Sequence, residues 1–90
     1  MRQTTGIVLI VEDNRSLAET LGNYLESQGF DVDYAADGLE GYRLAAENHY
    51  DAIVLDGNLP RLDGLEVCRR LRDEARNSTP VIMLTARDTL

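Results

Sequence analysis

Short apolar runs alternate along the chain with longer segments whose apolar positions recur at helical spacing. Four of the runs have the length and continuity of strands buried in a sheet. They cover residues 7–11, 30–35, 51–55 and 80–84, and the second is more polar, which places it nearer an edge. A proline at the first position of the fourth run is compatible with a strand, because a missing N–H is tolerated there.

Each of the three intervening segments carries the signals of a helix. Asn14 is placed to cap the first, which runs to about Gln28. Asp37 and Asp63 each precede a glutamate at capping-box spacing and begin the other two, the earlier of which ends near Asn48. The residues expected to face inward are Leu17, Leu21, Tyr24 and Leu25 in the first helix, Leu39, Tyr42 and Ala46 in the second, and Leu65, Cys68 and Leu71 in the third.

The resulting order βαβαβαβ predicts an α/β fold with a parallel sheet and right-handed crossovers. Ninety residues suffice for one domain, spanning 1–90, and the chain shows no linker, internal repeat or low-complexity segment.

Composition narrows the class of protein. A hydrophobic content of 43% and a charged content of 28% fit a globular chain, and the net charge of -7 argues against a nucleic-acid surface in this segment. No apolar run approaches the roughly 20 residues that cross a bilayer, and no secretion signal is recognisable at the start. A single cysteine, Cys68, excludes an intrachain disulfide and suits a reducing compartment. We therefore expect a cytoplasmic domain that binds neither nucleic acid nor membrane.

Three carboxylates are the strongest sign of chemistry. Glu12 and Asp13 follow the first predicted strand, and Asp56 follows the third. If these strands are parallel neighbours, all three acids emerge at one edge of the sheet, where they repel one another unless a cation lies between them. Mg²⁺ takes oxygen ligands of this kind, typically one or two carboxylates plus substrate oxygens. Such a site would also leave a carboxylate able to attack an electrophile.

The residues beside these acids suit a ligand site, because ligands of open parallel sheets bind beyond the carboxyl ends of the strands. Gly57 and Ala86 leave room for an incoming group. Asn58 offers a backbone carbonyl to a metal, and the Thr85 hydroxyl can donate to an anionic oxygen.

Four short motifs, in this order and at these spacings, resemble the receiver domain of two-component response regulators. They are Ile10-Val11-Glu12-Asp13, Val54-Leu55-Asp56-Gly57-Asn58-Leu59-Pro60, Asp63-Gly64-Leu65 and Leu84-Thr85-Ala86. The resemblance covers essentially the whole chain. It implies a flavodoxin-like sheet of strand order 2-1-3-4 with helices on both faces.

The resemblance also implies roles for individual residues. Asp56 would accept a phosphoryl group from a sensor histidine kinase, and the module would switch an output domain, often a DNA-binding one, without being an enzyme itself. Asp13 would bind Mg²⁺ directly, Glu12 directly or through water, and Asn58 through its backbone carbonyl. Thr85 would contact the phosphoryl oxygens. Pro60 and Gly64 would shape the loop beside the acceptor.

The chain departs from this family towards its C-terminal end. Relatives continue through a further helix, a strand carrying a lysine that pairs with the phosphoryl group, and a last helix, whereas all nine basic residues here are arginines. The expectation is a truncated receiver whose fourth strand forms an uncovered edge, and exposed apolar edges favour self-association. Gly57 replaces the larger apolar residue of many relatives, which would loosen the loop.

Each site residue also has a structural explanation. Asp13 and Asn14 can simply cap the first helix, and Glu12 can be a solvated charge at a strand end. Thr85 can be a loop hydroxyl, and the Asn58 side chain can stabilise a turn.

Among the other polar residues, His49 is expected at a solvated helix end and Cys68 in the core. Arg69, Arg70, Arg72 and Arg76 form a basic outer face, solvated or docking a kinase.

Two other functions remain open. A Mg²⁺-dependent phosphohydrolase also uses an aspartyl nucleophile, but its general acid usually stands two residues later, where this chain has Asn58. A fragment that cannot be phosphorylated and serves only in interactions is the third possibility, because the lysine is absent.

Overall fold

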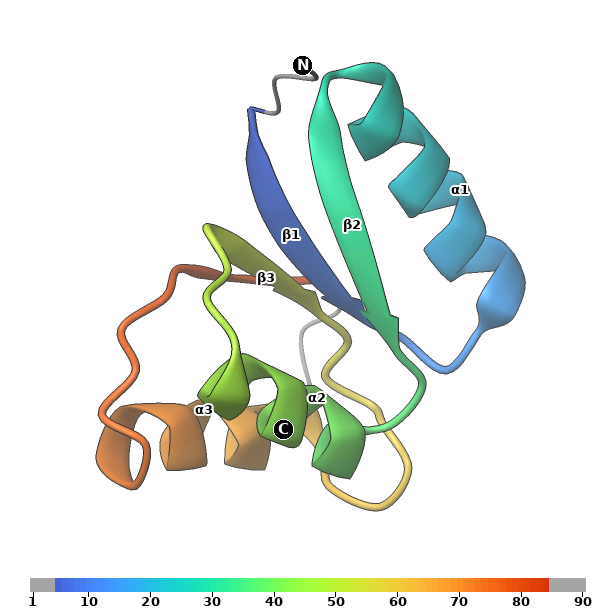
Figure 1. Cartoon of the computed structure of the whole chain (residues 1–90). Coiled ribbons are helices and arrows are strands. Elements are labelled where there is room, and N and C mark those ends of the chain that lie inside the picture. The colour runs from blue at the N-terminus through green and yellow to red at the C-terminus, as the bar shows by residue number, and fades with distance from the viewer. Residues whose placement is uncertain (1–4, 85–90) are drawn as a thin grey trace.

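The structure is a computed structural model that describes residues 5–84. Strands and helices alternate through this range, as the sequence predicts (Figure 1). In chain order they are β1 (Gly6–Val11), α1 (Arg15–Ser27), β2 (Phe30–Ala35), α2 (Gly38–Glu47), β3 (Ala52–Leu55), α3 (Gly64–Asp73) and β4 (Val81–Met83). The fourth strand is shorter than predicted, although the Pro80 carbonyl still accepts a hydrogen bond from the Ile53 amide at 2.9 Å.

The four strands form one parallel sheet in the order β2-β1-β3-β4, which confirms the predicted topology. In the register of the central strands, Val11 lies opposite Leu55, and Leu55 in turn lies opposite Met83. The carboxyl ends of β1, β3 and β4 therefore lie side by side. Residues that follow these strands meet at one edge of the sheet.

Alternate residues of the central strands point to opposite faces of the sheet, as strand geometry requires. Leu9, Val11 and Leu55 belong to the core beneath α2 and α3, whereas Ile10 and Val54 belong to the core beneath α1. Both cores exclude water almost completely at the centre of the sheet, since the exposed fraction of Leu9, Ile10 and Leu55 is 0%. The helices lie on the two faces accordingly (Figure 1).

The predicted inward faces of the helices are partly wrong. Leu17, Tyr24, Leu39, Ala46 and Leu65 are exposed. Small residues occupy much of the buried surface of the first two helices: Ala18 and Gly22 in α1, and Gly38, Gly41 and Ala45 in α2. In α3 the buried residues are Gly64, Val67 and Leu71. Helices with glycine or alanine at the contact lie close to the sheet, and branched side chains of the sheet fill the interface. The exposed apolar residues fall on the flanks of the helices, whereas Leu71 of α3 is fully buried, as predicted.

The two edge strands differ in character. β2 carries Asp31 and Asp33, and charged side chains on an edge strand discourage pairing with another chain. β4 consists of Val81, Ile82 and Met83, and Ile82 is 57% exposed. Across residues 5–84 no helix combines the length and the hydropathy that crossing a membrane requires.

Candidate functional site

The three predicted acids converge at the carboxyl edge of the sheet. Glu12, Asp13 and Asp56 each offer a carboxylate oxygen, and these oxygens all lie within 4.8 Å of one another. The parallel register explains the convergence, because the Asp56 amide donates to the Val11 carbonyl at 3.0 Å and thereby extends the β1–β3 ladder to the acids. We call these three residues the carboxylate cluster. Its formation confirms the spatial prediction made from the sequence.

Glu12 is a buried acid, 5% exposed, held by the backbone on both sides. Its own amide donates to the Ala35 carbonyl of β2 at 3.0 Å, and its Oε2 accepts from the Asn14 amide at 3.0 Å. Burial raises the pKa of Glu12, and the nearby carboxylates of Asp56 and Asp13 raise it further, while the Asn14 hydrogen bond opposes them. Glu12 is therefore not a solvated charge at a strand end.

Asp56 is also nearly buried, with 9% exposed, and its carboxylate is oriented by the loop that follows it. The Asn58 amide donates to Asp56 Oδ1 at 3.0 Å, which closes a turn through the aspartate side chain. The sequence suggested a turn stabilised by the Asn58 side chain. In the structure the Asp56 carboxylate stabilises the turn, by accepting from the Asn58 amide. Asn58 itself is exposed, and the use of its carbonyl as a metal ligand stays a prediction.

The capping alternative applies to Asn14 rather than to Asp13. Asn14 Oδ1 accepts from the Leu17 amide at 3.0 Å and forms the N-cap of α1. Asp13 is exposed and contributes its carboxylate to the cluster. Thr85 and Ala86, the remaining predicted site residues, lie outside the described range.

An open cleft of about 700 Å³ begins at the cluster and is bounded by α1 and β2. Glu12 and Asp13 line it, together with Arg15 and Tyr34. Arg15 was missed by the sequence reasoning, although its position in the first turn of α1, two residues after Asp13, could have indicated a cation near the acids. The cleft provides room for a group larger than a metal ion beside Glu12 and Asp13, whereas Asp56 is not among its lining residues.

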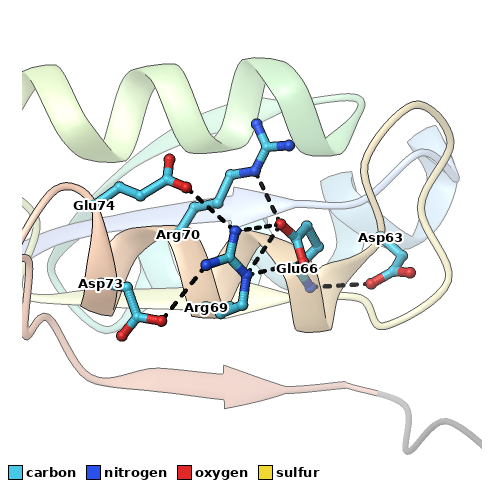
Figure 2. Close-up of polar contacts among 6 residues, drawn as sticks. All are labelled: Asp63, Glu66, Arg69, Arg70, Asp73 and Glu74. Atoms are coloured by element: carbon cyan, nitrogen blue, oxygen red, sulfur yellow. Dashed lines mark hydrogen bonds and ion pairs between the residues drawn. The ribbon is translucent and has the colours of Figure 1, made fainter.

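Two arginines of α3, Arg69 and Arg70, form ion pairs with neighbouring acids. Arg69 pairs with Glu66 at 2.7 Å, Glu74 at 3.2 Å and Asp73 at 3.5 Å (Figure 2). Arg70 pairs with the same Glu66 at 3.1 Å. Hydrogen bonds from Arg69 and Arg70 lower the pKa of Glu66 to about 2. Two of the four arginines of the predicted basic face, Arg69 and Arg70, are thus paired with acids of α3 and its C-cap. Exposed pairs of this kind contribute little to stability.

The loop that carries Asp56, residues 56–63, is held at its base by Gly64. The Gly64 amide donates to the Gly57 carbonyl at 3.2 Å. A Cβ atom at Gly64 would lie 2.5 Å from the Asp56 carbonyl oxygen, so only glycine allows α3 to begin this close to the acceptor. We call residues 56–63 the acceptor loop.

His49 and Cys68, for which the sequence predicted no part in the site, do not belong to the carboxylate cluster. His49 is 84% exposed and lies 3.7 Å from Asp51. Cys68 is half-buried against the core, and burial raises the pKa of its thiol, which makes it a poor nucleophile.

Comparison with known proteins agrees with this geometry. The family model described as the response regulator receiver domain matches residues 8–90. The chain is 47% identical over 83 residues to the response regulator MprA of Mycobacterium sp. strain KMS, and 46% identical to that of Mycolicibacterium vanbaalenii. In both cases the match covers 92% of this chain but only 36% of the relative, so the chain spans about a third of their length.

Solved structures show the same fold. The receiver domain of the Francisella response regulator 1452 superposes with a TM-score of 0.88 at 36% identity, covering 94% of this chain and 69% of that one. The receiver domain of the sensor histidine kinase PA1611 from Pseudomonas aeruginosa superposes with a TM-score of 0.83 at 38% identity, covering 91% of this chain and 68% of that one. That structure has a magnesium ion coordinated in its active site cleft.

Proposed function

Since the chain belongs to the response regulator receiver domain family, we propose that it is a phospho-accepting signalling module in which Asp56 receives a phosphoryl group from a sensor histidine kinase. The observation that carries the proposal is the convergence of Glu12, Asp13 and Asp56 within 4.8 Å at the carboxyl edge of the sheet. Two of the three acids are nearly buried, and so much negative charge in one place favours a cation as partner.

Mg²⁺ fits the donor set. Carboxylate and carbonyl oxygens are the ligands that this ion prefers, and it usually keeps several waters and binds substrate phosphates. Asp13 and Asp56 would hold it directly, Asn58 would add its backbone carbonyl, and Glu12 would bind directly or through water. When bound, the ion neutralises charge on the phosphoryl oxygens.

Asp56 is the nucleophile in this proposal. One of its carboxylate oxygens forms a bond to phosphorus while the bond from phosphorus to the donor breaks. A phosphohistidine protonated on its other ring nitrogen leaves as a neutral imidazole, and an acyl phosphate leaves as a carboxylate. The Asn58 amide fixes Oδ1 of Asp56 at 3.0 Å, so the carboxylate keeps one orientation before the donor arrives. Positioning of this kind is most of what phosphoryl transfer needs from a protein.

The readout of the phosphorylated state belongs to Thr85 in this proposal. Its hydroxyl would donate to the phosphoryl oxygens, and the charge added at Asp56 would rearrange the neighbouring loop. The Leu84 amide donates to the Leu55 carbonyl at 2.9 Å, which brings the chain alongside Asp56 immediately before Thr85. The module would switch an output domain, DNA-binding in a transcription regulator, in the cytoplasm, and would not itself be an enzyme.

We also propose that the open edge of β4 associates with a second copy of the chain. Ile82 is 57% exposed, and β4 has none of the aspartates that protect β2 at the opposite edge. An unprotected apolar edge can accept another strand through its backbone groups.

Two alternatives compete with the phosphoacceptor. A phosphohydrolase would need a general acid two residues after Asp56, and Asn58 does not supply one. A module inert to phosphorylation is favoured only by the absence of lysine from the 90 residues.

A titration with Mg²⁺ and beryllium fluoride, which mimics a phosphoryl group, separates these possibilities. In nuclear magnetic resonance spectra the amides of Glu12, Asp56 and Asn58 should shift saturably as Mg²⁺ is added, and beryllium fluoride should cause a further saturable shift only when Mg²⁺ is present. The Asp56→Asn variant should keep the fold and lose the beryllium fluoride response. No saturable change in the unsubstituted chain would contradict the phosphoacceptor and favour the inert module.

A further inference from the structure

The middle of the acceptor loop rests on the first turn of α2. The Gly38 amide donates to the Pro60 carbonyl at 3.3 Å, and that same carbonyl accepts from the Leu62 amide at 2.8 Å. Gly38 is the first residue of α2, and Asp37 caps the helix by accepting from the Glu40 amide at 2.9 Å. A rigid helix end thus holds a turn of the loop that carries the phosphoacceptor.

The turn itself is strained and needs support. Arg61, at its centre, has a φ of 72°, a left-handed value that a residue with a Cβ adopts at a cost. The Leu62–Pro60 hydrogen bond spans only three residues, as in a γ-turn with positive φ at its centre, which is the rarer and more strained form. The Asp37 carboxylate lies 3.8 Å from the exposed Arg61 guanidinium and adds little. Backbone packing against α2 is therefore the main restraint on the turn.

Only glycine permits this packing. A Cβ atom at position 38 would lie 1.6 Å from the Leu62 carbonyl oxygen and 2.6 Å from its carbon. Both are backbone atoms, so no side-chain rotation relieves the clash, and the turn would have to move away from α2.

Displacement of the turn would reach the metal site through Asn58. The loop is anchored at its base, where the Gly64 amide meets the Gly57 carbonyl, and by Leu59, which is 8% exposed in the core. Asn58 lies between these anchors and is exposed, so their positions set the direction of its carbonyl. The Pro60–Leu62 turn directly follows Leu59, so a displacement of the turn would also displace Leu59.

We propose that Gly38 is a positioning residue for the metal site: it allows α2 to hold the Pro60–Leu62 turn and so fixes the Asn58 carbonyl relative to Asp56. This inference rests on the proposed function, because it assumes that Asn58 is a ligand. Gly38 contacts neither metal nor phosphoryl group, and its effect passes through the loop backbone.

The Gly38→Ala variant tests the proposal through Mg²⁺ binding measured by isothermal titration calorimetry. Alanine is favoured over glycine inside a helix, so helix propensity alone predicts no loss. We expect the Mg²⁺ dissociation constant to rise roughly tenfold, the lower end of what removing support from a metal ligand produces.

Gly6→Ala is the control for an added methyl group at a glycine away from the site. Its Cβ would lie 2.8 Å from the Asp51 carboxylate, a side-chain contact rather than a backbone one, at the amino end of β1 and far from the cluster. This variant should bind Mg²⁺ as the unsubstituted chain does. Equal affinity in Gly38→Ala and the unsubstituted chain, or an equal loss in both variants, would overturn the role of Gly38.

Hydrogen exchange in the unsubstituted chain decides the matter if Gly38→Ala fails to fold. Binding and positioning are reciprocal, so saturating Mg²⁺ should slow exchange of the Gly38 and Leu62 amides relative to amides at the amino end of β1. Unchanged exchange at both amides would overturn the proposal. Failure of the unsubstituted chain to bind Mg²⁺ at all would instead refute the metal site and the proposed function with it.

Discussion

Val11 and Leu55 lie directly opposite each other in the β1–β3 register, and this pairing brings the acids that follow them together. Glu12 and Asp56 are the next residues, both nearly buried, and each is tied by its backbone amide to a neighbouring strand. The sheet therefore forces like charges into proximity. Electrostatic repulsion stored here in the absence of metal becomes a driving force for binding a cation.

Replacing Glu12 with glutamine should stabilise the metal-free fold and weaken metal binding. The amide removes a buried negative charge beside Asp56 while its oxygen can still accept from the Asn14 amide. We expect a higher free energy of unfolding without metal, measured by urea denaturation at neutral pH. The Mg²⁺ dissociation constant should rise at least about tenfold.

Asp51→Asn provides the control for this substitution, because Asp51 is an exposed acid at the opposite end of the sheet, accepting from the Ile7 amide. It should leave Mg²⁺ affinity unchanged. A Glu12→Gln variant that is less stable than the unsubstituted chain without metal would show that the cluster is not electrostatically strained.

Tyr50 makes the free energy of unfolding depend on pH in the alkaline range. Its hydroxyl donates to Asp33 Oδ2 at 2.8 Å, and the residue is 2% exposed. Burial, reinforced by the Asp33 carboxylate, raises the pKa of Tyr50 to about 12 from an ordinary value of 10.0. The unfolded chain thus loses this proton first, so the stabilising effect is complete below pH 10 and is lost as the pH rises towards about 12.

Tyr50→Phe should remove that part of the pH dependence. Below pH 10 the variant should be less stable by about 1 kcal/mol, the usual contribution of one hydrogen bond. Above pH 10 the difference should shrink, as followed by urea denaturation on both sides of that value. A constant difference across this range would contradict the role assigned to the buried phenol.

The open β4 edge predicts association of the chain with itself. A charge at the centre of an edge strand opposes pairing, so Ile82→Lys should shift the chain towards monomer in size-exclusion chromatography with light scattering. Leu65→Lys is the matched control, because Leu65 is 50% exposed on α3 rather than on the sheet edge. A monomeric unsubstituted chain at high concentration would refute the association.

The order of elements and the carboxylate cluster could be predicted from the sequence because they depend on local patterns. Apolar runs mark the strands, caps mark the helices, and parallel register then brings Glu12 near Asp56. The inward helix faces were harder to predict, because apolar periodicity favours Leu17 and Leu39 over the small residues that form the contact.

The role of Gly38 had no local signal. Its neighbours along the chain identify only a helix start, and its contact with Leu62 depends on how α2 lies against a loop more than twenty positions away in sequence. The positive φ of Arg61 could not be predicted either, because an arginine between Pro60 and Leu62 does not indicate a left-handed conformation.

Phosphoryl transfer to Asp56 from a small acyl phosphate, followed by intact-mass spectrometry, is the most direct test of the central claim. The unsubstituted chain should gain one phosphoryl group only when Mg²⁺ is present, and Asp56→Asn should gain none while keeping its fold. Labelling that persists in Asp56→Asn would place the acceptor elsewhere. Equal labelling with and without Mg²⁺ would contradict a metal-assisted phosphoacceptor built from Glu12, Asp13 and Asp56. Many turnovers of the donor per chain would contradict it too.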